Sequence, residues 1–192
     1  MKGKSLVLVF LVCSSFAFGT TTKEVFAKYP NKYFVETGTC SGGGVEKALV
    51  AGFKEVYSIE LSPHYYQLCL QKFAGQKNVH LYFGDSSKML PKILRQFKEP
   101  VTFWLDGHCS GGDTARGETM TPLMKELEAI RRHPIKTHTI LIDDVRCFGT
   151  QDFDFLSQET VIKKIKKINP HYTITYEDGY QPNDVLVAYI KK

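Results

Sequence analysis

The sequence predicts an α/β fold with three layers: a seven-stranded, mostly parallel sheet that ends in an antiparallel hairpin, with helices on both faces. Three observations predict this class. Strand-like and helix-like segments alternate with short connections, one strand-like run is apolar at every position, and the last two runs lie too close together for a crossover helix. The 192 residues, 43% hydrophobic and 23% charged, suit one globular domain with a sizeable core.

Seven runs rich in apolar and β-branched residues are the expected strands. They span 33–36, 56–61, 79–83, 102–106, 139–143, 172–176 and 185–190. The run from Thr139 to Ile142 is continuously apolar, which indicates a strand covered by helices on both faces. Only the short segment 177–184 joins the last two runs, and it predicts the antiparallel hairpin.

Helices are expected between these strands. One spans 45–51 and stops at Gly52, another begins with Ser62 as N-cap and Pro63 at its first position, and a third spans 88–97. Two more are marked by apolar side chains at i, i+4 and i+7: Leu123, Leu127 and Ile130 after the start signal Thr121-Pro122, and Val161, Ile165 and Ile168.

Residues 1–19 have the layout of a signal-peptide-like leader. Lys2 and Lys4 precede an apolar stretch over 6–18, and Ala17 and Gly19 offer small residues for a cleavage site. The stretch is shorter than the roughly 20 residues that cross a bilayer. We therefore expect a single domain over 20–192 that is exported (periplasmic, secreted or lumenal), with membrane contact only through the leader. A cytoplasmic protein is the alternative.

Charge and cysteine content limit the function classes. The net charge of +5 falls by two, to +3, if the leader with its two lysines is removed. The remaining lysines form no stripe, so nucleic acid is not an expected partner. Cys40, Cys69, Cys109 and Cys147 show neither a C-x-x-C pair nor zinc-like spacing, so no disulfide framework is expected.

A glycine-rich turn follows the first expected strand, with the sequence Glu36-Thr37-Gly38-Thr39-Cys40-Ser41-Gly42, and Gly43 and Gly44 lead from it into a helix. Such a turn lets backbone N–H groups approach a polar ligand, although it also fits an ordinary strand-to-helix connection. The second strand ends about 20 residues later in Glu60, at the place where ribose hydroxyls are usually accepted. The two features together predict a site for a nucleoside cofactor.

Acidic residues end the expected parallel strands. They are Glu36, Glu60, Asp85, Asp106, Asp143 and Asp144. Because the carboxyl ends of parallel strands meet at one edge, this charge should gather in one crevice, where a divalent cation would relieve the repulsion. Asp106, Asp143 and Asp144 with water would suit Mg²⁺. The alternative is that the aspartates only cap loops and accept backbone N–H groups.

Two further polar residues adjoin these aspartates. His108 is a candidate general base for a substrate hydroxyl or a further metal ligand, with a purely structural role as the alternative. Arg146 could offset the local charge or bind an anionic substrate, or form a simple salt bridge with the aspartates.

These motifs resemble class I S-adenosylmethionine-dependent methyltransferases, and among them the small metal-dependent O-methyltransferases of the catechol and macrocin type. The turn over 36–42 is similar to that family's methionine-binding motif, 58–63 to its ribose-binding strand, and 84–86 to its adenine-side motif. The segments 103–108 and 141–145 look like its metal motifs. The resemblance implies a Rossmann-like fold, S-adenosyl-L-methionine as cofactor, and Mg²⁺ or another divalent cation.

The resemblance also implies residue roles. Cofactor binding falls to Glu36, Gly38, Thr39, Gly42, Gly44, Glu60, Leu61, Asp85, Ser86 and Asp106, metal binding to Asp106, Asp143 and Asp144, and catalysis to Asp106 and His108. The implied reaction is O-methylation of a small hydroxylated acceptor. An aspartate at 144, where the catechol enzymes have asparagine, favours a sugar.

Two departures leave other classes open. Cys109 stands where the catechol enzymes carry a lysine base, and the segment 109–120 matches neither type, although we expect it to cover the acceptor. An exported, non-catalytic binding protein on the same fold is one alternative. A metal-dependent hydrolase that uses His108 and the aspartates is the other. The sequence does not predict the oligomeric state.

Overall fold

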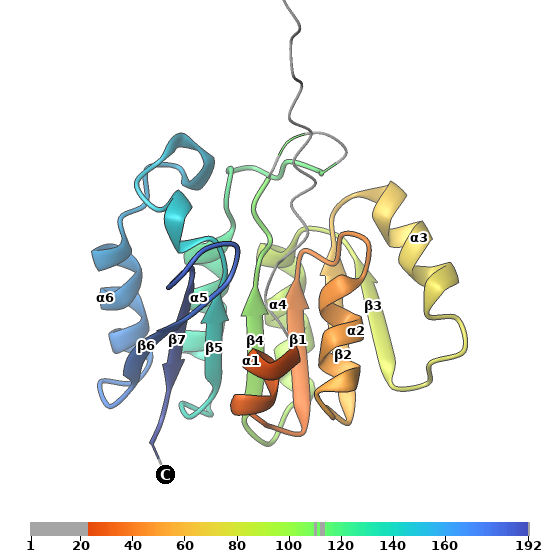
Figure 1. Ribbon diagram of the computed structural model, residues 1–192, viewed down its shortest axis with the longest axis horizontal. Coiled ribbons are helices and arrows are strands. Elements are labelled where there is room, and N and C mark those ends of the chain that lie inside the picture. Colours follow the sequence, from red (N-terminus) through yellow and green to blue (C-terminus); the bar gives the residue numbers. More distant parts are fainter. Residues whose placement is uncertain (1–22, 110, 112–113, 192) are drawn as a thin grey trace, which may run out of the picture.

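The computed structural model describes residues 23–109, 111 and 114–191 and consists of one sheet between two layers of helices (Figure 1). The strands are β1 (Tyr33–Thr37), β2 (Glu55–Glu60), β3 (Val79–Phe83), β4 (Val101–Leu105), β5 (Thr139–Ile142), β6 (Thr173–Glu177) and β7 (Val185–Tyr189). Their order is β3-β2-β1-β4-β5-β7-β6. Strands β1 to β5 pair in parallel, and β7 runs antiparallel to both β5 and β6. The predicted fold class is confirmed.

Six α-helices are present in the described part of the chain. They are α1 (Lys23–Lys28), α2 (Gly43–Val50), α3 (Pro63–Lys72), α4 (Ser86–Ile93), α5 (Leu123–Arg132) and α6 (Gln158–Ile168). Short 3₁₀ turns lie at Leu94–Gln96, Val145–Cys147 and Gln151–Phe153. Apolar side chains of α1, α2 and α3 pack on one face of the sheet, and those of α4, α5 and α6 pack on the other.

The central strands β1, β2, β4 and β5 are buried at nearly every position, so both faces of the sheet are covered there. All four residues of β5 are buried, as the continuously apolar run predicted. Trp104 in β4 is 2% exposed and packs edge-on against Phe26 of α1, with ring centroids 5.1 Å apart. Helix α1 was not predicted, because six residues beside an apolar leader are too few to display a helical period.

Small differences at the strand ends matter for the site. Strands β4 and β5 stop one residue earlier than expected, so Asp106 and Asp143 lie just beyond the sheet. Helix α4 begins two residues before the predicted Lys88, because the Asp85 carboxylate accepts a hydrogen bond from the backbone N–H of Ser87 (2.9 Å) and caps the helix.

The predicted leader at 1–19 lies outside the described residues. Within the described ranges, no helix is both long and apolar enough to cross a bilayer. Cys40, Cys69, Cys109 and Cys147 are free thiols, and Cys69 is buried.

Candidate functional site

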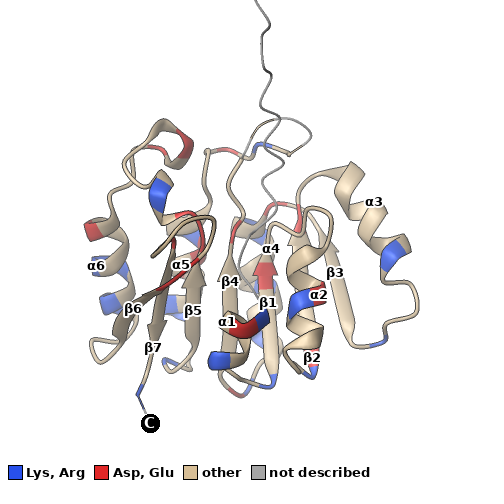
Figure 2. Ribbon diagram, in the orientation of Figure 1, with Lys and Arg blue, Asp and Glu red and all other residues tan. Residues whose placement is uncertain are grey.

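A cleft of about 270 Å³ opens at the carboxyl ends of β1 to β5. Predicted site residues that line it are Gly38, Glu60, Leu61, Asp85, Ser86, Asp106, His108, Asp143 and Asp144. The predicted residues Glu36, Thr39, Gly42 and Gly44 are not among its lining residues. Figure 2 shows acidic residues on the loops at the carboxyl ends of the central strands and in the β6–β7 connection. The strand ends therefore meet as the sequence pattern requires.

The glycine-rich turn is packed too tightly for side chains at three positions. Gly38 has φ +82°, and a Cβ there would lie 2.2 Å from the carbonyl oxygen of Asp106. At Gly44 a Cβ would lie 1.7 Å from Oε1 of Glu36. Gly42, also with positive φ, would strike the ring of Phe73 at 2.6 Å. The backbone of the turn therefore packs closely against the end of β4 and against Glu36.

Glu36 and Thr39 lie beneath this turn. Ser58 Oγ donates to Glu36 Oε2 (2.6 Å), and the hydroxyls of Thr39 and Ser58 are 2.6 Å apart. Burial raises the pKa of Glu36 to about 8; the hydrogen bond from Ser58 opposes this rise, and the nearby Asp106 and Glu60 add to it. Glu36 is thus a buried support for the turn, with its carboxyl favoured in the protonated form.

Glu60 ties two loops together at the rim of the cleft. Its Oε2 accepts from the backbone N–H of Cys40 (2.8 Å), and its Oε1 accepts from the N–H of Ser62 (2.6 Å). Glu60 is 7% exposed, and both Glu60 and the adjacent Leu61 line the cleft. The end of β2 is therefore fixed relative to the glycine-rich turn.

Asp85 and Ser86 form the far wall, at the start of α4. Ser86 Oγ donates to Oε1 of Glu126 on α5 (2.6 Å). Glu126 is 1% exposed, and burial raises its pKa to about 7 against the opposing hydrogen bond from Ser86. We did not predict Glu126. A signal existed, because it follows Leu123 by three residues and so lies on the apolar face of the helix.

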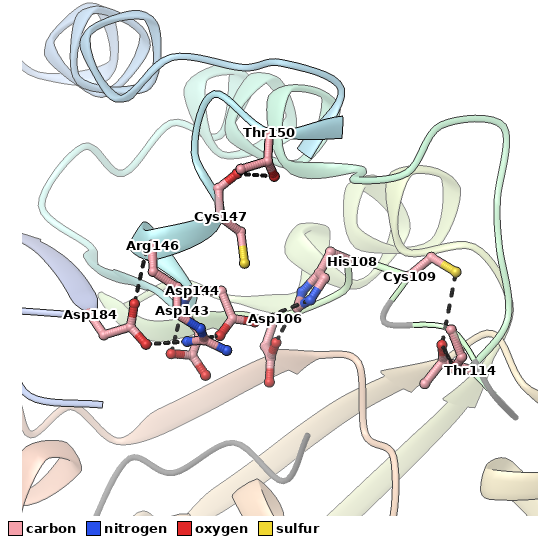
Figure 3. Close-up of polar contacts among 11 residues, drawn as sticks. Asp106, His108, Cys109, Thr114, Asp143, Asp144, Arg146, Cys147, Thr150 and Asp184 are labelled. Carbon is pink, nitrogen blue, oxygen red and sulfur yellow. Dashed lines mark hydrogen bonds and ion pairs between the residues drawn. The ribbon is translucent and has the colours of Figure 1, made fainter. Parts of the chain in front are cut away.

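His108 sits between two of the predicted aspartates (Figure 3). Its Nδ1 lies 3.5 Å from Asp106 Oδ1, and its Nε2 lies 3.1 Å from Asp144 Oδ2. Burial lowers the pKa of His108, but the carboxylates of Asp106 and Asp144 outweigh this effect and raise it above the usual value. One possible ligand atom from each of Asp106, His108 and Asp144 lies within 4.8 Å of the others.

A second acidic group adjoins the first and shares Asp144 with it. Ligand atoms of Asp143, Asp144 and Asp184 lie within 4.8 Å of one another. The guanidinium of Arg146 contacts Asp144 and Asp184, and its backbone N–H donates to Asp184 Oδ1 (3.0 Å). The pKa of Asp143 is raised well above its usual value by burial and by the charges of Asp106 and Asp144.

The predicted trio of aspartates is thus distributed over two neighbouring groups. Arg146 forms the salt bridge weighed from the sequence and also stacks on Tyr180, with its guanidinium carbon 4.8 Å from the ring centroid. Asp184 is fully buried in the connection between β6 and β7 and was not predicted. An aspartate in a hairpin connection is an ordinary turn residue, so the sequence carried no signal for it.

Comparisons by sequence find no matching family model and no matching curated protein. Solved structures do match. An O-methyltransferase from Bacillus cereus in complex with S-adenosylhomocysteine (SAH) aligns with TM-score 0.60 and 14% identity, over 88% of this chain and 78% of that chain. A protein assigned as an rRNA methylase from Clostridium thermocellum gives TM-score 0.58 and 16% identity over 88% and 95%. One assigned as a caffeoyl-CoA O-methyltransferase from Staphylococcus aureus gives 0.56 and 16% over 88% and 80%.

The chain therefore has the fold of the class I S-adenosylmethionine-dependent methyltransferases. At 14–16% identity, the TM-scores of 0.56–0.60 show a shared fold. The matching structures also differ in the acceptors that their names imply, from caffeoyl-CoA to rRNA.

Proposed function

We propose that this protein is an S-adenosylmethionine-dependent methyltransferase that methylates a hydroxyl group of a small acceptor, a sugar or another hydroxylated ring, with help from a divalent cation. One observation carries the proposal. Residues from four separate strand ends, Gly38, Glu60, Asp85 and Asp106, line one cleft at the carboxyl edge of the sheet, beside the group of Asp106, His108 and Asp144.

The residues present fit the cofactor. Gly38 lines the cleft and has no room for a side chain, so backbone would face a ligand there. Glu60 would hold the ribose, and Asp85 and Ser86 would lie at the adenine, as the resemblance implies. Glu36 and Thr39 would support the methionine end from beneath. When bound, the cofactor would supply a methyl group activated by its sulfonium.

The residues also fit a divalent cation. Ligand atoms of Asp106 and Asp144 lie within 4.8 Å of each other, and with water these carboxylate oxygens form a donor set that Mg²⁺ or Mn²⁺ accepts. Asp143, whose ligand atom lies within 4.8 Å of that of Asp144, would be a further ligand of the same cation. A bound cation would lower the pKa of the acceptor hydroxyl.

The chain's own contribution to the reaction is alignment and proton handling. The bound cofactor would supply the methyl group to the acceptor oxygen, and the electron pair of the carbon–sulfur bond would remain on its sulfur. The hydroxyl proton would pass to His108, whose ring lines the cleft. The rigid strand ends would hold the reactants in line, which supplies much of the rate enhancement in such transfers.

Titration calorimetry with SAH, with and without Mg²⁺, tests the proposal. We expect the wild-type protein to bind SAH, Glu60→Gln to bind it about tenfold or more weakly, and Asp144→Asn to bind it normally. A folded wild-type protein that gives no binding heat under either condition would contradict the assignment. Turnover of an ester or phosphate substrate that survives Glu60→Gln would favour the hydrolase instead.

A further inference from the structure

Residues 114–119, termed here the cover segment, form one wall of the cleft. Thr114, Ala115, Gly117, Glu118 and Thr119 all line it. The segment lies on the side of the cleft formed by the ends of β2 and β3, because a Cβ on Gly117 would be 3.8 Å from Oδ2 of Asp85 and from Cδ2 of Leu61. We had expected the surrounding segment 109–120 to cover the acceptor. This part of it also borders the proposed adenine position.

One glutamate near the C-terminal end of the cover segment, Glu118, anchors it to two helices. Glu118 Oε1 accepts from Lys88 Nζ of α4 (2.8 Å), and Glu118 Oε2 accepts from Lys125 Nζ of α5 (2.7 Å). Hydrogen bonds from the two lysines lower the pKa of Glu118 to about 2, so it stays ionised at any working pH. The single side chain thereby links the segment to two helices on the same side of the sheet.

The residues that directly follow the cover segment, Met120 and Thr121, are held by hydrogen bonds of their backbone. Backbone Cys109 N–H donates to the carbonyl of Met120 (2.9 Å), and Asp154 Oδ2 accepts from the N–H groups of Met120 (2.9 Å) and Thr121 (3.2 Å). These bonds involve the backbone. The links through Glu118 join side chains that are 49–61% exposed, and such pairs are weak and screened by salt.

We propose that the cover segment closes over the adenine end of the bound cofactor and that Glu118 is the positioning residue that holds it closed. The inference rests on the proposed function, since it takes the adenine to lie beside Asp85 and Ser86. With the segment closed, the cleft is slightly smaller than the roughly 300–1,000 Å³ usual for small-molecule sites. Cofactor exchange then requires that both Glu118 ion pairs break.

The dissociation rate of SAH, followed by stopped-flow displacement, tests this role. We expect Glu118→Gln to release SAH about fivefold faster than wild type, because two exposed ion pairs are lost. Glu159→Gln is the matched control, since Glu159 is an exposed glutamate paired with Lys163 (2.7 Å) on α6. High NaCl should accelerate release from wild type and from Glu159→Gln but leave Glu118→Gln nearly unchanged.

Limited trypsin digestion gives a second measurement that does not depend on the rate. Arg116 is an exposed cleavage site inside the cover segment. SAH should protect the bond after Arg116 in wild type and protect it less in Glu118→Gln. Equal release rates in all three proteins, or no protection of Arg116 by bound SAH, would overturn the inference while leaving the proposed function intact. A wild-type protein that binds no SAH would overturn both.

Discussion

At the scale of single residues, the glycine-rich turn depends on close backbone approach. Gly43 and Gly44 are neighbours at the start of α2, yet a Cβ on Gly43 meets nothing within 4 Å, whereas one on Gly44 would overlap Glu36 Oε1. We predict that Gly44→Ala lowers the free energy of unfolding by more than about 2 kcal/mol and weakens SAH binding. The matched variant Gly43→Ala should leave both nearly unchanged, as measured by urea denaturation and calorimetry. Equal effects of the two would contradict the tight packing at Gly44.

The free energy of unfolding should depend on pH through the single carboxyl group of Glu36. Its pKa of about 8 lies above the usual 4.5, so the stabilisation it gives is complete below pH 4.5 and is lost as the pH rises through about 8. Between these limits we expect a loss on the order of a few kcal/mol. Glu36→Gln should remove this part of the slope in unfolding free energies measured at pH 5 and pH 9. A variant with the same slope as wild type would show that Glu36 is already ionised.

At the scale of the elements, a comparison of two helix caps distinguishes an effect on folding stability from an effect on cofactor binding. Asp85 caps α4 at the wall of the cleft, and Ser157 caps α6 through a hydrogen bond from the N–H of Thr160 (3.2 Å), away from it. Replacing either residue by alanine should cost about 1 kcal/mol of stability. Only Asp85→Ala should also weaken SAH binding in calorimetry. If Ser157→Ala weakened binding equally, Asp85 would be acting only through the stability of the fold.

The same elements show which site residues the sequence pattern could predict and which it could not. An acidic residue lies at or just after the end of each parallel strand, and this pattern correctly predicts that Glu60 and Asp106 lie at the same edge of the sheet. Asp184 could not, because its partner Arg146 is 38 residues away. Glu126 could be assigned to the apolar face of its helix, but its contact with Ser86, 40 residues away, could not be predicted. The periodicity of apolar residues predicts local helices and strands, but it does not predict which loop, distant in the sequence, packs over a site.

At the scale of the whole molecule, the cleft concentrates negative charge that the fold compensates only in part. Asp106, Asp143, Asp144 and Asp184 meet His108 and Arg146 where β4, β5 and the β6–β7 connection converge. Asp144 belongs to both acidic groups. We predict that Mn²⁺ raises the melting temperature of the wild-type protein and not that of Asp144→Asn, while both respond equally to SAH. An equal Mn²⁺ shift in the variant would place the cation elsewhere.

The most direct test is a crystal soaked with SAH and Mn²⁺, with anomalous diffraction to locate the metal. We predict SAH along the cleft from Gly38 to Ser86, its ribose at Glu60, and an anomalous peak within coordination distance of Asp106 and Asp144. Well-diffracting crystals whose cleft stays free of both, or SAH bound outside the carboxyl edge of the sheet, would contradict the account.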